Sequence, residues 1–188
     1  MKHLPAKKAK AKEWVDIIAP PYFGATDLGK TLAVEPEKVV GRRITLSALD
    51  VSENVNKFYL KVFFRIVKLE GNKALTEFDG SECLRDYISR MVLRRVRRID
   101  TVQDLQTKDG KMIRVKGLAV ISRRAKRNVQ IAVKNRIMEM LKSLVESSTL
   151  EQFVEDIFTD EIKSRILQEV RVIYPVRNFE IRKTEMVR

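Results

Sequence analysis

The chain has very few of the residues on which catalytic and metal sites depend. It contains one histidine, His3, and one cysteine, Cys83. A single thiol excludes an internal disulfide, and one histidine with one cysteine cannot supply the ligands of a zinc site. His3 lies in a lysine-rich stretch, where no rigid surrounding would hold it as a general base. Cys83 fits a small buried residue of a protein from a reducing compartment, so we expect a cytoplasmic location.

Motifs that mark several other classes of protein are missing as well. The sequence has neither G-x-G-x-x-G nor G-x-x-x-x-G-K followed by Ser or Thr, and therefore signals no phosphate-cradling loop. It has no run of about 18 apolar residues, so we expect no membrane span. Its basic start, MKHLPAKKAKAKE, lacks the apolar stretch of a secretory signal. The residues predict no cofactor and no metal ion.

Positive charge is abundant and is concentrated in blocks. The chain has 38 Lys and Arg against 25 Asp and Glu, which gives a net charge of +13. Residues 1–12 hold five lysines and no acid, residues 85–98 six arginines and one acid, and residues 108–127 eight cations and one acid. Residues 139–161 reverse the sign, with seven acids and one lysine. Such segregation is unlike a surface that only keeps a protein soluble, and it favours a polyanionic partner.

The first half of the chain shows the pattern of β-strands. Residues 57–69 alternate, with Phe58 and Phe64 on one side and Phe63 on the other, and all three are expected in the core. Residues 43–49 and 73–78 are the expected antiparallel partners, closed by a turn at residues 79–81. Ser81 is then the expected N-cap of a helix that runs to about residue 92. Residues 97–106 and 112–122 flank a hairpin turn at residues 107–110.

After residue 128 the apolar spacing becomes helical. A first stripe runs from Val129 to Leu144, a second short helix is capped by Ser148 or Thr149, and a third spans Ile162 to Val170. Residues 178–186 alternate again as a last strand. We therefore predict an α+β fold with an antiparallel, β-barrel-like sheet, flanking C-terminal helices and a basic extended N-terminal arm. Residues 1–13 are expected to be the disordered arm, and residues 14–188 a single α+β RNA-binding domain.

The candidate RNA-binding residues follow from the basic blocks. Arginine offers a planar fork of donors that matches phosphate, and its charge does not titrate away. Arg90, Arg94 and either Arg97 or Arg98 are expected on one helix face, while Arg114 and Lys116 point outward from a strand. The complete predicted set is Lys7, Lys8, Lys10, Lys12, Arg90, Arg94, Arg95, Arg97, Arg98, Arg114, Lys116, Arg123, Arg124, Lys126 and Arg127.

Alternatives exist for individual residues and for the chain as a whole. Trp14 could stack on a base or anchor the arm to the body, and the anchor is the favoured interpretation. A membrane-surface protein that uses the basic arm is a further alternative, which flotation with anionic liposomes would test. An RNA-processing or RNA-modifying enzyme would need carboxylates such as Asp79, Glu82, Asp86 and Asp100 to converge, whereas turn and capping roles account for the first three. We predict that the protein is not an enzyme.

Five stretches of the sequence resemble one known family. They are EWVDIIAPPYFG, GKTLAVEPEKVVGRRI, FDGSECLRDYISRMVLRRVRRID, TKDGKMIRVKGLAVISRRAK and IYPVRNFEIRKTEM. In the same order they resemble the archaeal and eukaryotic small-subunit ribosomal protein S-three-a, or S-one-e, from about residue 12 to the C-terminus. The family's first motif is matched by Trp14, Asp16, Ala19, Pro20 and Phe23.

A second block of the family is matched less completely. This chain has Ser89 where the family has arginine, and Leu93 interrupts the arginine run. The long C-terminal extension of eukaryotic members is absent, which resembles the archaeal form.

The resemblance implies a function that composition and spacing alone do not reach. It implies a structural constituent of the small ribosomal subunit, on the platform near the messenger RNA exit. The implied partners are small-subunit ribosomal RNA, the neighbouring ribosomal proteins of the platform and messenger RNA. The resemblance also implies a ribosome-associated cytoplasmic protein with no catalytic residues to transfer.

Overall fold

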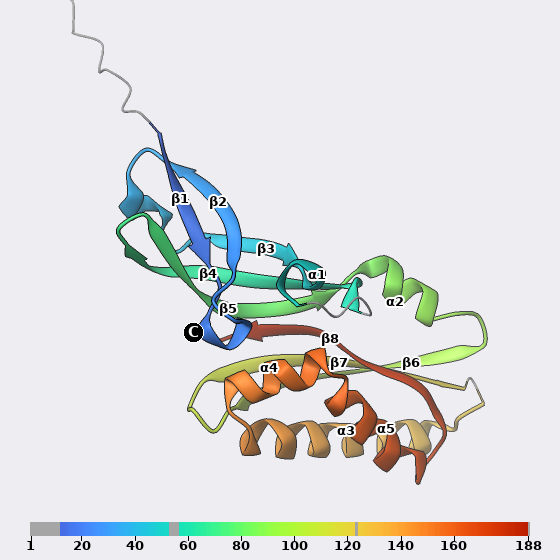
Figure 1. Ribbon diagram of the computed structural model, residues 1–188. Coiled ribbons are helices and arrows are strands. Elements are labelled where there is room, and N and C mark those ends of the chain that lie inside the picture. The colour runs from blue at the N-terminus through green and yellow to red at the C-terminus, as the bar shows by residue number, and fades with distance from the viewer. Residues whose placement is uncertain (1–11, 53–56, 123, 188) are drawn as a thin grey trace, which may run out of the picture. The chain divides into compact units, whose positions relative to one another are not determined.

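The computed structural model describes residues 12–52, 57–122 and 124–187, and it shows an α+β fold as expected (Figure 1). Besides two short 3-10 helices, at Pro21–Phe23 and Pro36–Val39, the structure contains thirteen main helices and strands among the described residues. These are β1 (Glu13–Ile18), β2 (Asp27–Ala33), β3 (Arg43–Ser47), α1 (Ala48–Val51), β4 (Leu60–Glu70), β5 (Lys73–Cys83), α2 (Arg85–Met91), β6 (Val96–Gln106), β7 (Met112–Ser122), α3 (Arg127–Ser147), α4 (Leu150–Phe158), α5 (Glu161–Arg171) and β8 (Val176–Met186).

The chain forms two compact units. The first contains the described residues up to Ile44 together with Phe64–Phe78. The second contains the described residues of Thr45–Phe63 and of the segment from Asp79 onward. Strands β4 and β5 contribute residues to both units. Of the expected N-terminal arm, residues 1–11 lie outside the described residues, and Glu13 already belongs to β1.

The first unit is built on the β1–β2 hairpin. The two strands pair antiparallel, and β1 also pairs in parallel with the start of β5. Alternation in β1 turns Val15 inward, where it packs with Ala33, Val39, Ile66 and Ala74 in a buried cluster. Strand β2 was not predicted from the sequence, because its polar residues and its glycine give no clear alternation.

The second unit carries a three-stranded antiparallel sheet covered by helices. The β6–β7 hairpin runs in continuous register from Val96 opposite Ser122 to Gln106 opposite Met112, and β8 pairs antiparallel with β7. Helices α3, α4 and α5 cover one face of this sheet, and α2 lies on the other (Figure 1). On the α2 side, the Nδ2 of Asn178 in β8 contacts the Sδ of Met91 at 3.0 Å.

Several predicted elements of this unit are confirmed. Strand β7 has the predicted bounds, and Thr149 caps α4 through a reciprocal pair of hydrogen bonds with Gln152. Three apolar residues at helical spacing, Ile162, Ile166 and Val170, form the buried stripe of α5. Apolar periodicity located these helices because each has a single buried face.

The predicted end of the first strand region is wrong. Ser81 is not a helix N-cap but lies inside β5, where its backbone N–H donates to the Oγ1 of Thr184 at 2.9 Å. Strand β5 continues through Gly80–Glu82 because this segment pairs with β8, about 100 positions later in the chain. Helix α2 therefore starts at Arg85, with Leu84 as its N-cap. A partner so distant in sequence leaves no local signal.

Two further expectations need correction. Phe58 is 56% exposed, because β4 begins only at Leu60 and Phe58 lies in the preceding turn, whereas Phe63 and Phe64 are buried as predicted. The sheet is mixed rather than purely antiparallel, since β1 and β5 run in parallel. Among the described residues its strands follow the order β2-β1-β5-β8-β7-β6, with β4 paired to β5 and β3 to β4, so a closed barrel is not confirmed.

Candidate nucleic-acid interface

The first basic block is divided between a helix, a turn and a strand. Helix α2 ends at Met91, so Arg90 lies in its last turn while Arg94 and Arg95 lie in the turn before β6. Arg95 has a left-handed backbone with φ of 65°. The predicted common helix face of Arg90, Arg94 and Arg97 or Arg98 is therefore wrong. The helix ends before Arg94, and from Val96 onward the chain forms strand β6 of the β6–β7 hairpin.

The second basic block ends at the junction between β7 and α3. Buried Ala125 anchors this junction, since its N–H donates to the Ser122 carbonyl and its own carbonyl accepts from Gln130 Nε2 at 2.9 Å. Arg124, Lys126 and Arg127 are exposed around it. Helix α3 begins at Arg127 with no side-chain cap and no acid in its first turn. Its first N–H groups therefore lack a capping side chain and lie beside three cations, an arrangement that favours an anion.

The tertiary structure brings these two blocks together. Val96 pairs with Ser122, so the turn before β6 and the junction after β7 leave the hairpin at the same end (Figure 1). We call this the cationic end and define it by six exposed residues. None of the six has an ion-pair partner within the part of the chain that the structure describes. They are Arg90, Arg94, Arg95, Arg124, Lys126 and Arg127.

Three other predicted binding residues are already neutralised by their own chain. Arg98 forms a bidentate pair with Asp100, with Nη2 and Oδ1 2.7 Å apart. Arg114 lies opposite Asp104 across the hairpin, with Nε and Oδ1 2.6 Å apart. The Nζ of Lys116 lies 2.8 Å from Glu185 Oε2.

Two of these ion pairs lower the pKa of their acid, and all three leave the cation less able to bind phosphate. Arg114 holds the pKa of Asp104 below its ordinary value through its hydrogen bonds. Hydrogen bonds from Lys116 and Lys183 hold the pKa of Glu185 at about 2. Counting outward from the predicted strand ends, with residue 106 opposite residue 112, would have placed Asp104 opposite Arg114, so this pair was accessible from the sequence.

Two of the remaining predicted residues lie among the described residues, and four do not. Arg97 is exposed on β6, and Lys12 is exposed just before β1. Lys7, Lys8, Lys10 and Arg123 lie outside the described residues.

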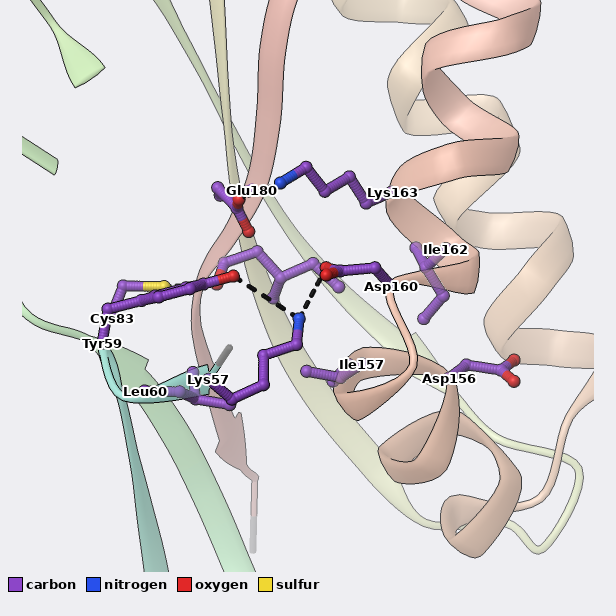
Figure 2. Close-up of a pocket in the computed structure, with 11 residues that line it drawn as sticks. Lys57, Tyr59, Leu60, Cys83, Asp156, Ile157, Asp160, Ile162, Lys163 and Glu180 are labelled. Atoms are coloured by element: carbon purple, nitrogen blue, oxygen red, sulfur yellow. Dashed lines mark hydrogen bonds and ion pairs between the residues drawn. The ribbon is translucent and has the colours of Figure 1, made fainter. Parts of the chain in front are cut away.

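A polar pocket in the second unit gathers the other charged groups of interest (Figure 2). The Nζ of buried Lys57 donates to Asp160 Oδ1 at 2.5 Å, and the ring of Tyr59 stacks on Tyr87 with centroids 3.7 Å apart. The hydroxyl of Tyr87 donates to Glu180 at 2.9 Å, and Lys163 also pairs with Glu180. The pocket thus joins the segment before β4 to α2, β8 and the α4–α5 turn.

The chemistry of this pocket is that of a structural contact. Burial raises the pKa of the Cys83 thiol to about 12 and raises the pKa values of Tyr59 and Tyr87. A nucleophilic thiol needs the opposite shift, toward a thiolate at neutral pH. Cys83 Sγ instead donates to the Ile181 carbonyl at 3.2 Å, and the residue is buried as predicted.

The carboxylates that an enzyme would need occupy separate positions. Glu82 pairs with Lys183, Asp86 lies in the first turn of α2, and Asp100 binds Arg98. Asp79 is buried within β5. Across residues 12–52, 57–122 and 124–187, no three His, Cys, Asp or Glu side chains form a group that could hold a metal ion. Within the same residues, no helix has both the length and the apolar character to cross a membrane.

Comparison with known proteins gives consistent matches over nearly the whole chain. The model of the Ribosomal S3Ae family matches residues 3–188. A protein of Sulfurisphaera tokodaii named small ribosomal subunit protein eS1 is 35% identical over 181 residues, which cover 96% of this chain and 94% of the relative. Proteins with the same name from Methanopyrus kandleri and Sulfolobus acidocaldarius are 38% and 37% identical, over 96% of this chain and 87% and 92% of the relatives.

Proposed function

This chain belongs to the ribosomal S3Ae family, and from this premise we propose that it is a structural constituent of the small ribosomal subunit that binds ribosomal RNA through its cationic end. The three relatives carry the name of a ribosomal protein, and none is named as an enzyme.

One observation supports the RNA-binding surface above all others. Parts of two basic blocks separated in the sequence meet at one end of the β6–β7 hairpin, and the six cations of the cationic end have no ion-pair partner among the described residues. Unpaired guanidinium groups such as Arg94 and Arg124 can give both edges of their donor fork to phosphate oxygens. Free N–H groups at the start of α3 add donors that carry no counterion. The surface recognises a phosphate backbone rather than a base sequence.

The finer placement of the protein follows from the resemblance to its family. We place it on the platform near the messenger RNA exit, in contact with neighbouring ribosomal proteins, with messenger RNA as a further partner and the cytoplasmic ribosome as its location. Residues 14–188 act as one ribosomal domain in this proposal, because β4 and β5 supply residues to both compact units.

The test is a double charge reversal at the cationic end. Arg94→Glu combined with Arg124→Glu is expected to abolish incorporation into small subunits and to weaken binding of small-subunit ribosomal RNA by at least tenfold, because about 1.4 kcal/mol of lost phosphate contact already corresponds to that factor. Incorporation is measured by sedimentation of labelled protein with subunits, and RNA binding by filter retention. Circular dichroism checks that the fold is retained.

A matched control uses the other end of the same hairpin. Lys108→Glu with Lys111→Glu changes the net charge equally at two exposed residues beside the hairpin turn. This variant is expected to retain most of its incorporation. Equal losses in the two variants would show that only net charge matters, and normal incorporation of the cationic-end variant would contradict the assigned surface.

A further inference from the structure

The first unit exposes its one tryptophan on strand β1. Trp14 is 56% exposed on β1, and Leu32, directly opposite on β2, is 40% exposed. The other side of the same hairpin holds Val15 and Ala33, which are buried. The fold therefore has an inner apolar side for this hairpin and still presents an indole and a leucine outward. The favoured expectation that Trp14 is a packing anchor is not supported by this position.

One cation lies at the edge of this hairpin, and another precedes it in the chain. Arg42 Nη1 donates to the backbone carbonyl of Leu32 at 3.0 Å and to Thr31 Oγ1 at 3.1 Å, which fixes an exposed guanidinium at the edge of β2, beside the Leu32 backbone. Arg42 has no ion-pair partner among the described residues. Lys12 is exposed two positions before Trp14. The next outward pair along the hairpin, Asp16 with Lys30, is closed by a 3.2 Å ion pair.

We propose that Trp14 and Leu32 form a stacking platform for an unpaired RNA base, with Arg42 and Lys12 placed for the adjoining phosphates. Every base has a flat π-face that an exposed aromatic ring can cover, whereas bases inside a duplex already stack on one another. The ligand class is therefore single-stranded RNA, such as a loop or a bulge. An acidic protein segment could be attracted by the same cations, but it has no nucleotide base to stack on the exposed indole of Trp14.

This proposal rests on the RNA-binding role proposed above, but it uses none of the residues of the cationic end. It also predicts a signal that phosphate contact alone does not produce. Because Trp14 is the only tryptophan of the chain, the intrinsic fluorescence of the intact protein reports on this position alone.

The experiment titrates a short oligouridylate into the full chain while tryptophan fluorescence is recorded. Saturable quenching is expected, since a stacked base contacts the indole directly. Inorganic polyphosphate, which has the charge but no bases, is expected to leave the emission nearly unchanged. In a second assay with labelled oligouridylate, Trp14→Ala is expected to weaken binding by roughly 5- to 150-fold, the range for one stacked base. Trp14→Phe, which keeps an aromatic ring, is expected to retain most of the affinity.

The outcomes separate this proposal from the proposed function. If oligouridylate causes no quenching while the protein still binds ribosomal RNA, the platform is overturned and the ribosomal role stands. Quenching that persists in the Arg94→Glu, Arg124→Glu variant supports the platform independently of the cationic end. Quenching by an acidic peptide but not by oligouridylate would assign the surface to a protein partner and overturn the proposal. Equal affinities of Trp14→Ala and the wild type would overturn it as well.

Discussion

At the scale of single residues, Lys57 is a buried cation of the second unit that depends on one acidic partner. Its side chain is 97% removed from solvent, and its ammonium is neutralised by Asp160, which lies in the turn between α4 and α5. Asp160 has a left-handed backbone with φ of 62°, a conformation that Asp and Asn adopt more readily than most residues. A buried ion pair adds little net stability, but loss of one partner leaves an uncompensated charge.

This asymmetry gives a prediction. Asp160→Asn keeps the backbone preference but removes the partner of the buried ammonium, and is expected to lower the free energy of unfolding by about 3 kcal/mol, the lower end of the range for broken buried pairs. Lys57→Met is expected to cost less, because the Asp160 side chain is 39% exposed and its carboxylate stays hydrated. Urea denaturation followed by circular dichroism measures both. A larger loss in Lys57→Met would contradict the assignment of the ammonium as the dependent charge.

At the scale of elements, strand contacts distant in sequence define the second unit. Gly80 in β5 has φ of 143°, and a Cβ there would lie 2.2 Å from the Thr184 carbonyl oxygen of β8. Glycine is therefore required for the close approach of β5 to β8. Near this contact, Lys116 of β7 and Lys183 of β8 both donate to Glu185, at 2.8 and 2.7 Å. The carboxylate thus links two neighbouring strands.

The lowered pKa of Glu185 predicts an acid-dependent loss of stability. The folded carboxyl binds its proton at about pH 2, whereas the ordinary pKa is 4.5. Its stabilising contribution is therefore complete above pH 4.5 and is lost as the pH falls through about 2. Glu185→Gln is expected to be about 1–2 kcal/mol less stable than the wild type at neutral pH, after allowance for solvent screening.

The pH series tests the sign of this effect. In urea denaturation from neutral pH downward, the difference between Glu185→Gln and the wild type should shrink steadily below pH 4.5. A difference that stays constant to the lowest pH would mean that packing, not the charge of Glu185, is responsible.

At the scale of the whole molecule, the charge is polarised along the second unit. Helix α3 starts at the cationic end and runs 21 residues to the hairpin turn, where Lys108 N–H donates to the Ser148 carbonyl and Asp109 accepts from Leu150 N–H at 2.9 Å. The helix spans about 30 Å at about 1.5 Å per residue. The acids on α4 and at the end of α3 are thus separated from the start of α3 by more than a Debye length of about 8–10 Å. These acids therefore weaken the electrostatic attraction of the cationic end for phosphate only slightly.

This distribution predicts a moderate salt dependence. The logarithm of the affinity falls linearly with the logarithm of the salt concentration, with a slope of about −0.9 for each neutralised phosphate. If five of the cationic-end residues each neutralise a phosphate, affinity for ribosomal RNA should therefore fall roughly 500-fold between 50 and 200 mM salt. Arg94→Glu with Arg124→Glu should make this slope less steep by about 2.

A charge swap, Asp104→Arg with Arg114→Asp, keeps both the net charge and the ion pair, so it should leave the slope unchanged. A changed slope in the swap would place phosphate contacts on the paired residues. A flat dependence in the wild type would remove the electrostatic basis of the RNA surface.

Much of the second half of the fold was predictable because its signals are local. The helices α3, α4 and α5 each carry an apolar stripe, the β6–β7 hairpin has a strong turn sequence, and Thr149 is a cap within three residues of its partner. The first half was predicted less well. Strand β2, the extension of β5 past Ser81 and the exposure of Phe58 all depend on partners or strand limits that neighbouring residues do not encode.

The sequence by itself determined that this protein is cationic, α+β and similar to one ribosomal family, since charge blocks, periodicity and motif order are properties of neighbouring residues. Tertiary structure alone decided which cations are available. Strand pairing placed Lys116 beside Glu185 of β8, brought the turn at Arg94 to the same end of the hairpin as the junction at Arg124, and turned Trp14 outward. The physical reason is that ionic pairing and burial depend on distance in space, which the chain sets only when strands from distant segments align.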